Sequence, residues 1–278
     1  MLIDDIMRLG SGAGETVYFA KSLYGYPLML LRKGKPNGGG VLVVGAVHAR
    51  EHITAKLLSL LMAEYSGDYP IDVVPALNPD GVILSTEGME AFSLKKSERL
   101  KLLRINDGSG DFSLWKANLR GVDINVNFDA GWGTGEGNLR RPAPANYIGA
   151  YPGSEPETRA AVSLMNSGRY ALVVAYHSKG EEVYWGFGEY AEYRKEAEAV
   201  ARALGYKLKR TPHSAGGLKD YWIARHNLPG LTVEVGEECF PHPYPESRLT
   251  ELGKKHSGIF EIYAEIAKKV WKDKLSGT

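Results

Sequence analysis

His48, Glu51 and His52 stand together directly after an apolar segment, and their side chains are of the types that bind zinc. An imidazole and a carboxylate three residues apart can converge on one ion, and catalytic zinc sites commonly combine His and Glu ligands with an open position for water. Such a pair is common by chance in a chain with seven His. Its position adds weight, because open α/β sheets bind ligands at the carboxyl ends of their strands.

Two more polar side chains occur in comparable places. His177 follows the apolar run 170–176, and Glu234 lies inside the apolar run 231–235. A zinc site that begins with a His and a Glu requires a third ligand from elsewhere in the chain, and His177 can supply it. A carboxylate inside an apolar run is costly unless it has a partner or a function.

The elements that must position these residues alternate along the chain. Apolar runs rich in β-branched residues predict buried strands, and segments with helical periodicity lie between them. Strands are expected at 41–47, 71–77, 170–176, 182–185 and 231–235, and helices at 53–65, 155–166, 190–204, 218–226 and 246–272. This alternation predicts an α/β fold, a three-layer sandwich with a central mixed, mostly parallel sheet flanked by helices.

The middle of the chain, from about 108 to 153, is rich in Gly, Pro and Asn and has little periodicity. A loop of this length inside a compact domain is usually functional. We find no internal repeat and no low-complexity linker, so a single domain over residues 1–278 is expected.

The composition is that of an ordinary globular protein. The 278 residues are 44% hydrophobic and 24% charged, and 34 basic against 33 acidic side chains give a formal net charge of +1. Such a balance provides no long-range field, so neither nucleic acid nor a membrane surface is expected as a partner. Cys239 is the only cysteine, which excludes an intrachain disulfide. The first residues lack the basic and apolar segments of a signal peptide, which predicts a cytoplasmic location. No oligomeric state is predicted.

Several short motifs, in order along the chain, resemble those of the zinc carboxypeptidases of the carboxypeptidase A type. They are His48-Ala49-Arg50-Glu51, Asn78-Pro79-Asp80-Gly81, Trp115-Lys116-Ala117-Asn118, Gly121-Val122-Asp123-Ile124-Asn125, Ser154-Glu155-Pro156-Glu157-Thr158, His177-Ser178 and Glu234. Together they extend over most of the chain and are far more specific than any one of them. The resemblance implies an α/β sandwich around a mixed, twisted sheet.

The resemblance also implies roles for individual residues. His48, Glu51 and His177 would bind one zinc ion, and Glu234 would act as general base and general acid. Lys116 stands where the family places an arginine that stabilises the charge developing on the carbonyl oxygen; lysine supplies the charge without a bidentate fork. Asp123 would accept the second ring proton of His48 and so fix its tautomer.

Two departures from the family pattern concern the substrate. Digestive members follow the asparagine at the position of Asn125 with an arginine that binds the C-terminal carboxylate, whereas this chain has Val126. Their closing tyrosine should lie just before Gly216-Gly217, where this chain has His213 instead.

The segments Asn125-Val126-Asn127-Phe128 and Trp132-Gly133-Thr134-Gly135 look more like the bacterial branch that cleaves γ-D-glutamyl-diamino acid bonds in cell-wall muropeptides. We therefore expect a peptide or muropeptide substrate. Because guanidinium groups match carboxylates bidentately, Arg50 and Arg141 are expected to bind it together with Asn125 and His213.

Other interpretations remain open. His48, Glu51 and His52 also have the order of an inverted zincin motif, but that arrangement needs one helix and leaves His177 and Glu234 without a role. A general metallocarboxypeptidase that releases C-terminal amino acids keeps the metal and changes the substrate. An N-acyl amino acid deacylase does the same, and a zinc-free peptide-binding module would retain only the fold.

Overall fold

The computed structural model describes residues 6, 14–35, 38–190, 193–211 and 213–277, and its centre is an eight-stranded sheet in the order β1-β2-β4-β3-β5-β8-β6-β7. In the described part of the chain the strands are β1 (Glu15–Lys21), β2 (Pro27–Lys33), β3 (Gly40–Val44), β4 (Ile71–Val74), β5 (Tyr170–Ser178), β6 (Glu182–Trp185), β7 (Lys207–Arg210) and β8 (Gly230–Val235).

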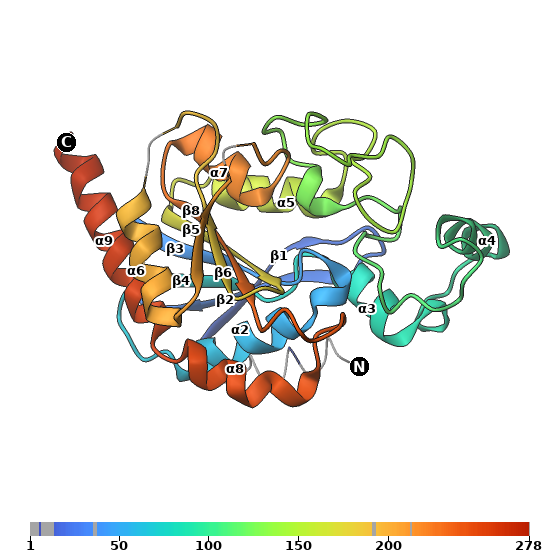
Figure 1. Ribbon diagram of the computed structural model, residues 1–278, viewed down its shortest axis with the longest axis horizontal. Coiled ribbons are helices and arrows are strands. Elements are labelled where there is room, and N and C mark those ends of the chain that lie inside the picture. Colours follow the sequence, from blue (N-terminus) through green and yellow to red (C-terminus); the bar gives the residue numbers. More distant parts are fainter. Residues whose placement is uncertain (1–5, 7–13, 36–37, 191–192, 212, 278) are drawn as a thin grey trace.

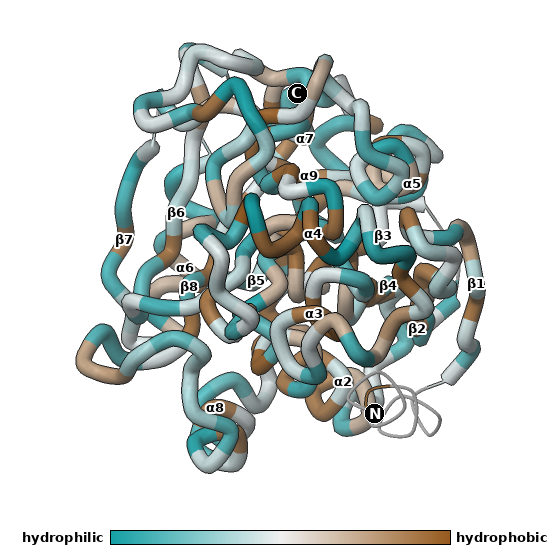
Figure 2. Tube along the Cα trace, turned by 90° about the vertical axis from the view of Figure 1, so that its right-hand side faces the viewer, coloured by the Kyte–Doolittle hydropathy of each residue, from teal (hydrophilic) through white to brown (hydrophobic). Residues whose placement is uncertain are grey.

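The sheet is mixed. β3 pairs in parallel with β4 and β5, β5 with β8, and β6 with β7, whereas the remaining neighbours are antiparallel. Every residue of β3 and β5 is buried, as expected for strands covered on both faces. Figure 2 shows the edge strands β1 and β7 at opposite sides of the molecule. The edge strand β7 reads Lys-Leu-Lys-Arg, and charged edges of this kind oppose pairing with other chains.

Helices cover both faces of this sheet, which confirms the predicted three-layer α/β sandwich. The helices are α2 (Ile53–Glu64), α3 (Pro79–Glu87), α4 (Lys96–Ile105), α5 (Pro156–Met165), α6 (Arg194–Leu204), α7 (Leu218–His226), α8 (Leu249–His256) and α9 (Ile259–Ser276). Short 3-10 turns are η1 (Ala49–Glu51), η2 (Met89–Ala91), η3 (Ile124–Val126) and η4 (Glu246–Arg248). In Figure 1, α5 and α7 lie on one side of the sheet, and α2 and α8 lie on the other. In the part of the chain that can be described, no helix is long and apolar enough to cross a bilayer.

The closing segment differs from its prediction. The sequence predicts one helix over 246–272, but the structure has η4, α8 and α9, with Gly258 between α8 and α9. Gly258 has φ +77°, a left-handed conformation that glycine adopts without steric cost. The buried His256 at the end of α8 contacts Tyr206, with 3.0 Å between its Nε2 and the phenolic oxygen. The break lets α9 change direction and pack against β3 and β5.

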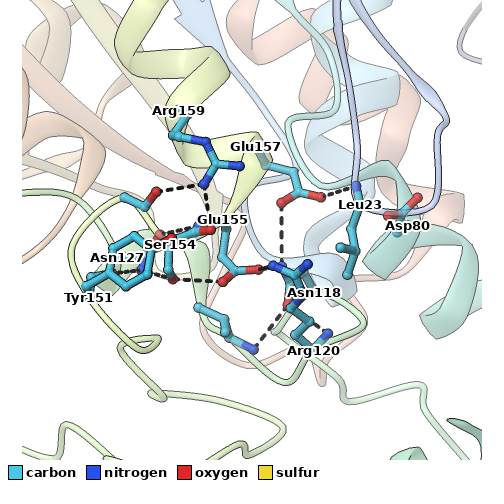
Figure 3. Close-up of polar contacts among 12 residues, drawn as sticks. Leu23, Asp80, Asn118, Arg120, Asn127, Tyr151, Ser154, Glu155, Glu157 and Arg159 are labelled. Carbon is cyan, nitrogen blue, oxygen red and sulfur yellow. Dashed lines mark hydrogen bonds and ion pairs between the residues drawn. The ribbon is translucent and has the colours of Figure 1, made fainter.

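A buried polar network connects the long loop between α4 and α5 to the rest of the fold (Figure 3). Asn118 Nδ2 donates to Glu155 Oε2 at 2.7 Å, and Asn127 Nδ2 donates to the hydroxyl of Ser154 at 3.0 Å. Glu157 accepts a hydrogen bond from the backbone N–H of Leu23, in the turn between β1 and β2. Because Asn118 and Asn127 flank the segment 119–126, this network fixes the loop on both sides of it.

Candidate active site

Three neighbouring strands bring the predicted chemical residues to one edge of the sheet. β3, β5 and β8 lie side by side, and their parallel pairing places their carboxyl ends together. His177 near the end of β5 is directly opposite Glu234 of β8 in the strand register. His48 follows β3 by four residues, because the strand ends at Val44 and not at the predicted residue 47.

Backbone hydrogen bonds attach the His48 segment to the long loop. The N–H groups of Ala49 and Arg50 donate to the carbonyl oxygens of Lys116 and Trp115 at 3.1 and 3.0 Å. Two segments that are far apart in sequence therefore run side by side at the strand ends. This pairing is what brings the Lys116 segment to the His48 segment.

The side chains of His48, Glu51 and His177 are buried, and their possible ligand atoms lie close together. The Nδ1 atom of His48 lies 2.8 Å from Oε1 of Glu51, and Nδ1 of His177 lies 2.9 Å from Oε2 of the same carboxylate. The two Nδ1 atoms are 3.1 Å apart. Within the described residues this is the one group of His, Cys, Asp and Glu side chains close enough to hold a metal ion.

The donor set fits zinc. Tetrahedral zinc with ligands at about 2.0 Å separates its ligand atoms by about 3.3 Å, close to the separations seen between these atoms. The two ring nitrogens and the carboxylate they share are all electron-pair donors. A cation between them gives each donor a partner, which they cannot all give one another. Nδ1 of His177 faces the other two donor atoms, and its Nε2 atom is buried without a hydrogen-bond partner among the described residues.

His52 does not join this group. Its Nε2 atom lies 3.6 Å from Oε1 of Glu246, and its Nδ1 atom is buried without a hydrogen-bond partner in the described part of the chain. Glu51 ends η1 and His52 precedes α2, so His48, Glu51 and His52 do not share one helix. The geometry disfavours the inverted zincin arrangement.

Asp123 lies behind His48 and beside Lys116. Its Oδ1 atom is 3.2 Å from Nε2 of His48, and its Oδ2 atom is 3.4 Å from Nζ of Lys116. Burial alone would raise the pKa of the Asp123 carboxyl, but the charges of Lys116 and His48 hold it well below its usual range. An ionised Asp123 can accept the Nε2 proton of His48, which leaves the Nδ1 lone pair directed at the other two ligands.

Glu234 faces the same site from β8. Burial raises the pKa of its carboxyl to about 8, and the negative charge of Glu51 acts in the same direction, whereas the charge of His177 opposes it. A bound zinc ion would also favour the ionised form. A carboxyl with a pKa near neutrality can both take and return a proton, which is the property a general base and acid needs.

A cavity of about 600 Å³ lies on the same face of the sheet as Glu234. It is lined in part by Thr232, two residues before Glu234 on β8 and therefore on the same face, and by Tyr184, which is opposite Thr232 in the register. The full lining is Asn125, Val126, Thr134, Gly135, Glu136, Asn138, Asn146, Tyr184, Thr211, His213, Ser214, Ala215, Gly217, Lys219, Asp220 and Thr232. Since Thr232 and Glu234 are adjacent on one face, the cavity adjoins the candidate metal centre.

The predicted substrate-binding residues fall into two groups. Asn125 and the exposed His213 line the cavity, and Asn125 Oδ1 also accepts a hydrogen bond from the N–H of Leu218 at the start of α7. Arg141 is exposed and is not among the described lining residues. Arg50 is also outside the lining, and its Nε atom is buried without a hydrogen-bond partner in the described chain.

Gly216 is what lets the loop before α7 approach η3. Its φ is +77°, and a Cβ atom there would lie 2.7 Å from the carbonyl oxygen of Val126. The Gly216 carbonyl oxygen accepts a hydrogen bond from the N–H of Phe128 at 3.0 Å. Because of this close contact, His213 and Asn125 line the same cavity.

Sequence reasoning did not identify Tyr184, Lys219, Asp220 or His242. Tyr184 and Glu182 are two residues apart on β6 and lie on the same face of the sheet as Glu234. The two-residue period of the strand makes this shared face visible in the sequence. Lys219 and Asp220 are adjacent charged residues at the start of a helix whose first six residues are all buried, and a pair of charges among apolar neighbours is visible in the sequence. His242 lies beyond β8, where burial and the charge of Arg50 lower its pKa to about 4.

Comparisons with known proteins agree with this geometry. A family model described as zinc carboxypeptidase matches residues 2–255. The chain is 37% identical over 193 residues to gamma-D-glutamyl-L-diamino acid endopeptidase 1 of Lysinibacillus sphaericus. The aligned region covers 68% of this chain and 48% of that protein. The chain is also 27% identical over 231 residues to murein peptide amidase A of Escherichia coli strain K12. That aligned region covers 79% of this chain and 80% of the amidase. The chain thus spans about half the length of the endopeptidase.

Solved structures share the fold at lower identity. The structure of bovine thrombin-activatable fibrinolysis inhibitor in complex with tick carboxypeptidase inhibitor has a TM-score of 0.72 at 19% identity, covering 98% of this chain and 97% of that chain. Murein-tripeptide amidase of Escherichia coli O157 has a TM-score of 0.59 at 22% identity, covering 91% of this chain and 94% of that chain. These likenesses concern the fold alone.

Proposed function

The chain belongs to the zinc carboxypeptidase family of metallopeptidases, and from this premise we propose that it hydrolyses the γ-D-glutamyl-diamino acid bond of cell-wall muropeptides. The observation that carries the proposal is the convergence of the His48, Glu51 and His177 donor atoms within 3.1 Å of one another, with Glu234 opposite His177. We further propose that these three residues hold a single zinc ion.

Zinc bound by three protein ligands lowers the pKa of its water to about 7 and polarises a carbonyl group. Glu234, opposite His177 in the strand register, would take the proton of the attacking water and return it to the leaving amine. Lys116 supplies positive charge for the carbonyl oxygen, while Asp123 holds both Lys116 and the ring of His48 in position. No covalent intermediate with the protein is required.

The choice of substrate rests on two supports. The endopeptidase and the amidase named above act, by their names, on diamino acid and murein peptides. Val126 lines the cavity with an apolar side chain, and none of the described lining residues is an arginine. The cytoplasmic location expected from the sequence stays a prediction.

The decisive experiment offers purified, zinc-loaded protein two substrates and identifies the products by mass spectrometry. One substrate is L-Ala-γ-D-Glu-meso-diaminopimelate, and the other is an ordinary peptide with a free C-terminus. We expect release of diaminopimelate from the first and no trimming of the second. The Glu234→Gln variant, which keeps the shape of the side chain, is the inactive control.

Other outcomes point elsewhere. Trimming of the ordinary peptide alone would overturn the substrate proposal and indicate a general metallocarboxypeptidase. Release of an acyl group from N-acyl amino acids, with both peptides intact, would indicate a deacylase. Binding of muropeptide without turnover of any substrate would indicate a peptide-binding module.

A further inference from the structure

A buried ion pair forms part of the wall of the cavity beside the metal centre. Lys219 and Asp220 open α7, both line the cavity, and the two residues are 5% and 2% exposed. Nζ of Lys219 lies 2.6 Å from Oδ1 of Asp220. Burying charges in this way has a high desolvation cost that a surface pair would avoid, so we expect the pair to have a function.

Asp220 has little hydrogen-bonding capacity left for a ligand. Its Oδ1 atom accepts from the hydroxyl of Ser214 at 2.7 Å as well as from Lys219, and its Oδ2 atom accepts from the N–H of Gly217 at 3.2 Å. These contacts hold the carboxylate at the start of α7. Asp220 therefore positions Lys219 and partly balances its charge.

Lys219 is less completely satisfied. Its ammonium group has three N–H donors. Two make short contacts of 2.6 Å, to Asp220 and to the carbonyl oxygen of Gly186. The third has only the oxygen of Ser214 at 3.4 Å, beyond the usual range of about 2.7–3.2 Å for such bonds. A ligand that enters the cavity can offer this donor an acceptor, and a carboxylate is the strongest one.

The same cavity carries an exposed negative charge. Glu136, from the long loop, lines the cavity and is exposed, so its carboxylate is free to meet a positive group on a ligand. The cavity thus presents a buried cation donor and a more exposed anion. A group that bears a carboxylate and an ammonium on one carbon complements both.

We propose that Lys219 binds the distal carboxylate of a diaminopimelyl residue while Glu136 accepts from the ammonium group on the same carbon. This assignment rests on the proposed function and specifies its substrate. Of the two residues joined by the scissile bond, only the diamino acid has a side chain that ends in such a charge-separated group. The side chain of a substrate lysine ends in an ammonium group without a carboxylate, so it leaves the third N–H donor of Lys219 without an acceptor.

Three matched tripeptides of the form L-Ala-γ-D-Glu-X test the assignment through kcat/KM. In the first X is meso-diaminopimelate, in the second its distal carboxylate is amidated, and in the third X is L-lysine. We expect kcat/KM to fall by about 10- to 100-fold in the second and third, the range for loss of one charge-assisted hydrogen bond. The Lys219→Met variant should treat all three alike, and Lys254→Met, at an exposed position of α8, should keep the preference of the unaltered protein.

The amidated substrate probes the distal charge in the unaltered protein, so the test does not depend on how well a variant folds. Equal rates for all three substrates, or an unchanged preference in Lys219→Met, would overturn the assignment. A calorimetric titration with free meso-diaminopimelate and with L-lysine separates it from the proposed function. Lys219-dependent binding of diaminopimelate without cleavage of any tripeptide would reject the proposed bond and keep the assignment. Absence of both binding and cleavage would reject both.

Discussion

Glu157 provides a test of how burial controls the stability of this fold. The side chain is fully buried at the start of α5, where one oxygen accepts a hydrogen bond of 2.9 Å from the N–H of Leu23. Burial, with smaller contributions from the nearby acids Asp80 and Glu155, raises the pKa of its carboxyl from 4.5 to about 7, against the effect of the Leu23 hydrogen bond. Figure 3 shows Glu157 between Leu23 and Asn118. The change to make is Glu157→Gln, which keeps a carbonyl oxygen for Leu23 and cannot ionise.

The sign follows from proton binding. The folded protein keeps the Glu157 proton up to about pH 7, whereas the unfolded chain releases it near pH 4.5, so the folded state binds more protons between these values. The free energy of unfolding from this group is therefore highest below pH 4.5 and decreases as the pH rises through the folded pKa. Two pKa values 2.5 units apart give a loss of about 2.5 kcal/mol between about pH 5 and pH 8.5.

The assay is urea unfolding followed by circular dichroism at several pH values, with the same zinc concentration for every protein. We expect the difference in unfolding free energy, Glu157→Gln minus unaltered protein, to rise by about 2.5 kcal/mol from pH 5 to pH 8.5. Glu64→Gln, at an exposed position of α2, is the matched control and should show a constant difference. A pH-independent difference for Glu157→Gln would refute the reasoning, because it would mean that the folded carboxyl titrates as it does in the unfolded chain.

The remaining predictions concern the active site. His177→Ala should lose the bound zinc whereas His52→Ala should retain it, because Nδ1 of His177 lies 2.9 Å from the Glu51 carboxylate and His52 does not join this group. Mass spectrometry of the metal content checks this prediction. Loss of zinc in His52→Ala alone would support the inverted zincin motif instead. Lys116→Met should lower kcat by about 10²- to 10³-fold, the usual effect of removing one group that stabilises a developing oxyanion, with zinc content unchanged. Steady-state kinetics measure the Lys116 effect, Lys116→Arg should restore part of it, and an unchanged kcat in Lys116→Met would contradict the role.

The sequence determined those features that depend on local pattern. Apolar runs located β5, β6 and β8 to within two residues. For β5, burial on both faces leaves a continuous hydrophobic signal. β1, β2 and β7 are not among the predicted strands. β1 and β7 have no buried residue and carry no such run, and the short buried run of β2 contains no β-branched residue. The spacing of His48 and Glu51 is also local, so the amino-acid sequence by itself indicates the first half of the zinc site.

The tertiary structure alone decided what depends on contacts between distant segments. His177 faces Glu51 only because β5 is placed beside β3, and sequence spacing does not report which strands are neighbours. The break at Gly258 was hidden because the apolar periodicity continues on both sides of it. The cavity combines residues from the long loop, β6, α7 and β8, and the Lys219–Asp220 pair acquires its chemical meaning there. The sequence shows two charges among apolar neighbours, but only the packing shows that the pair is buried in the wall of this cavity.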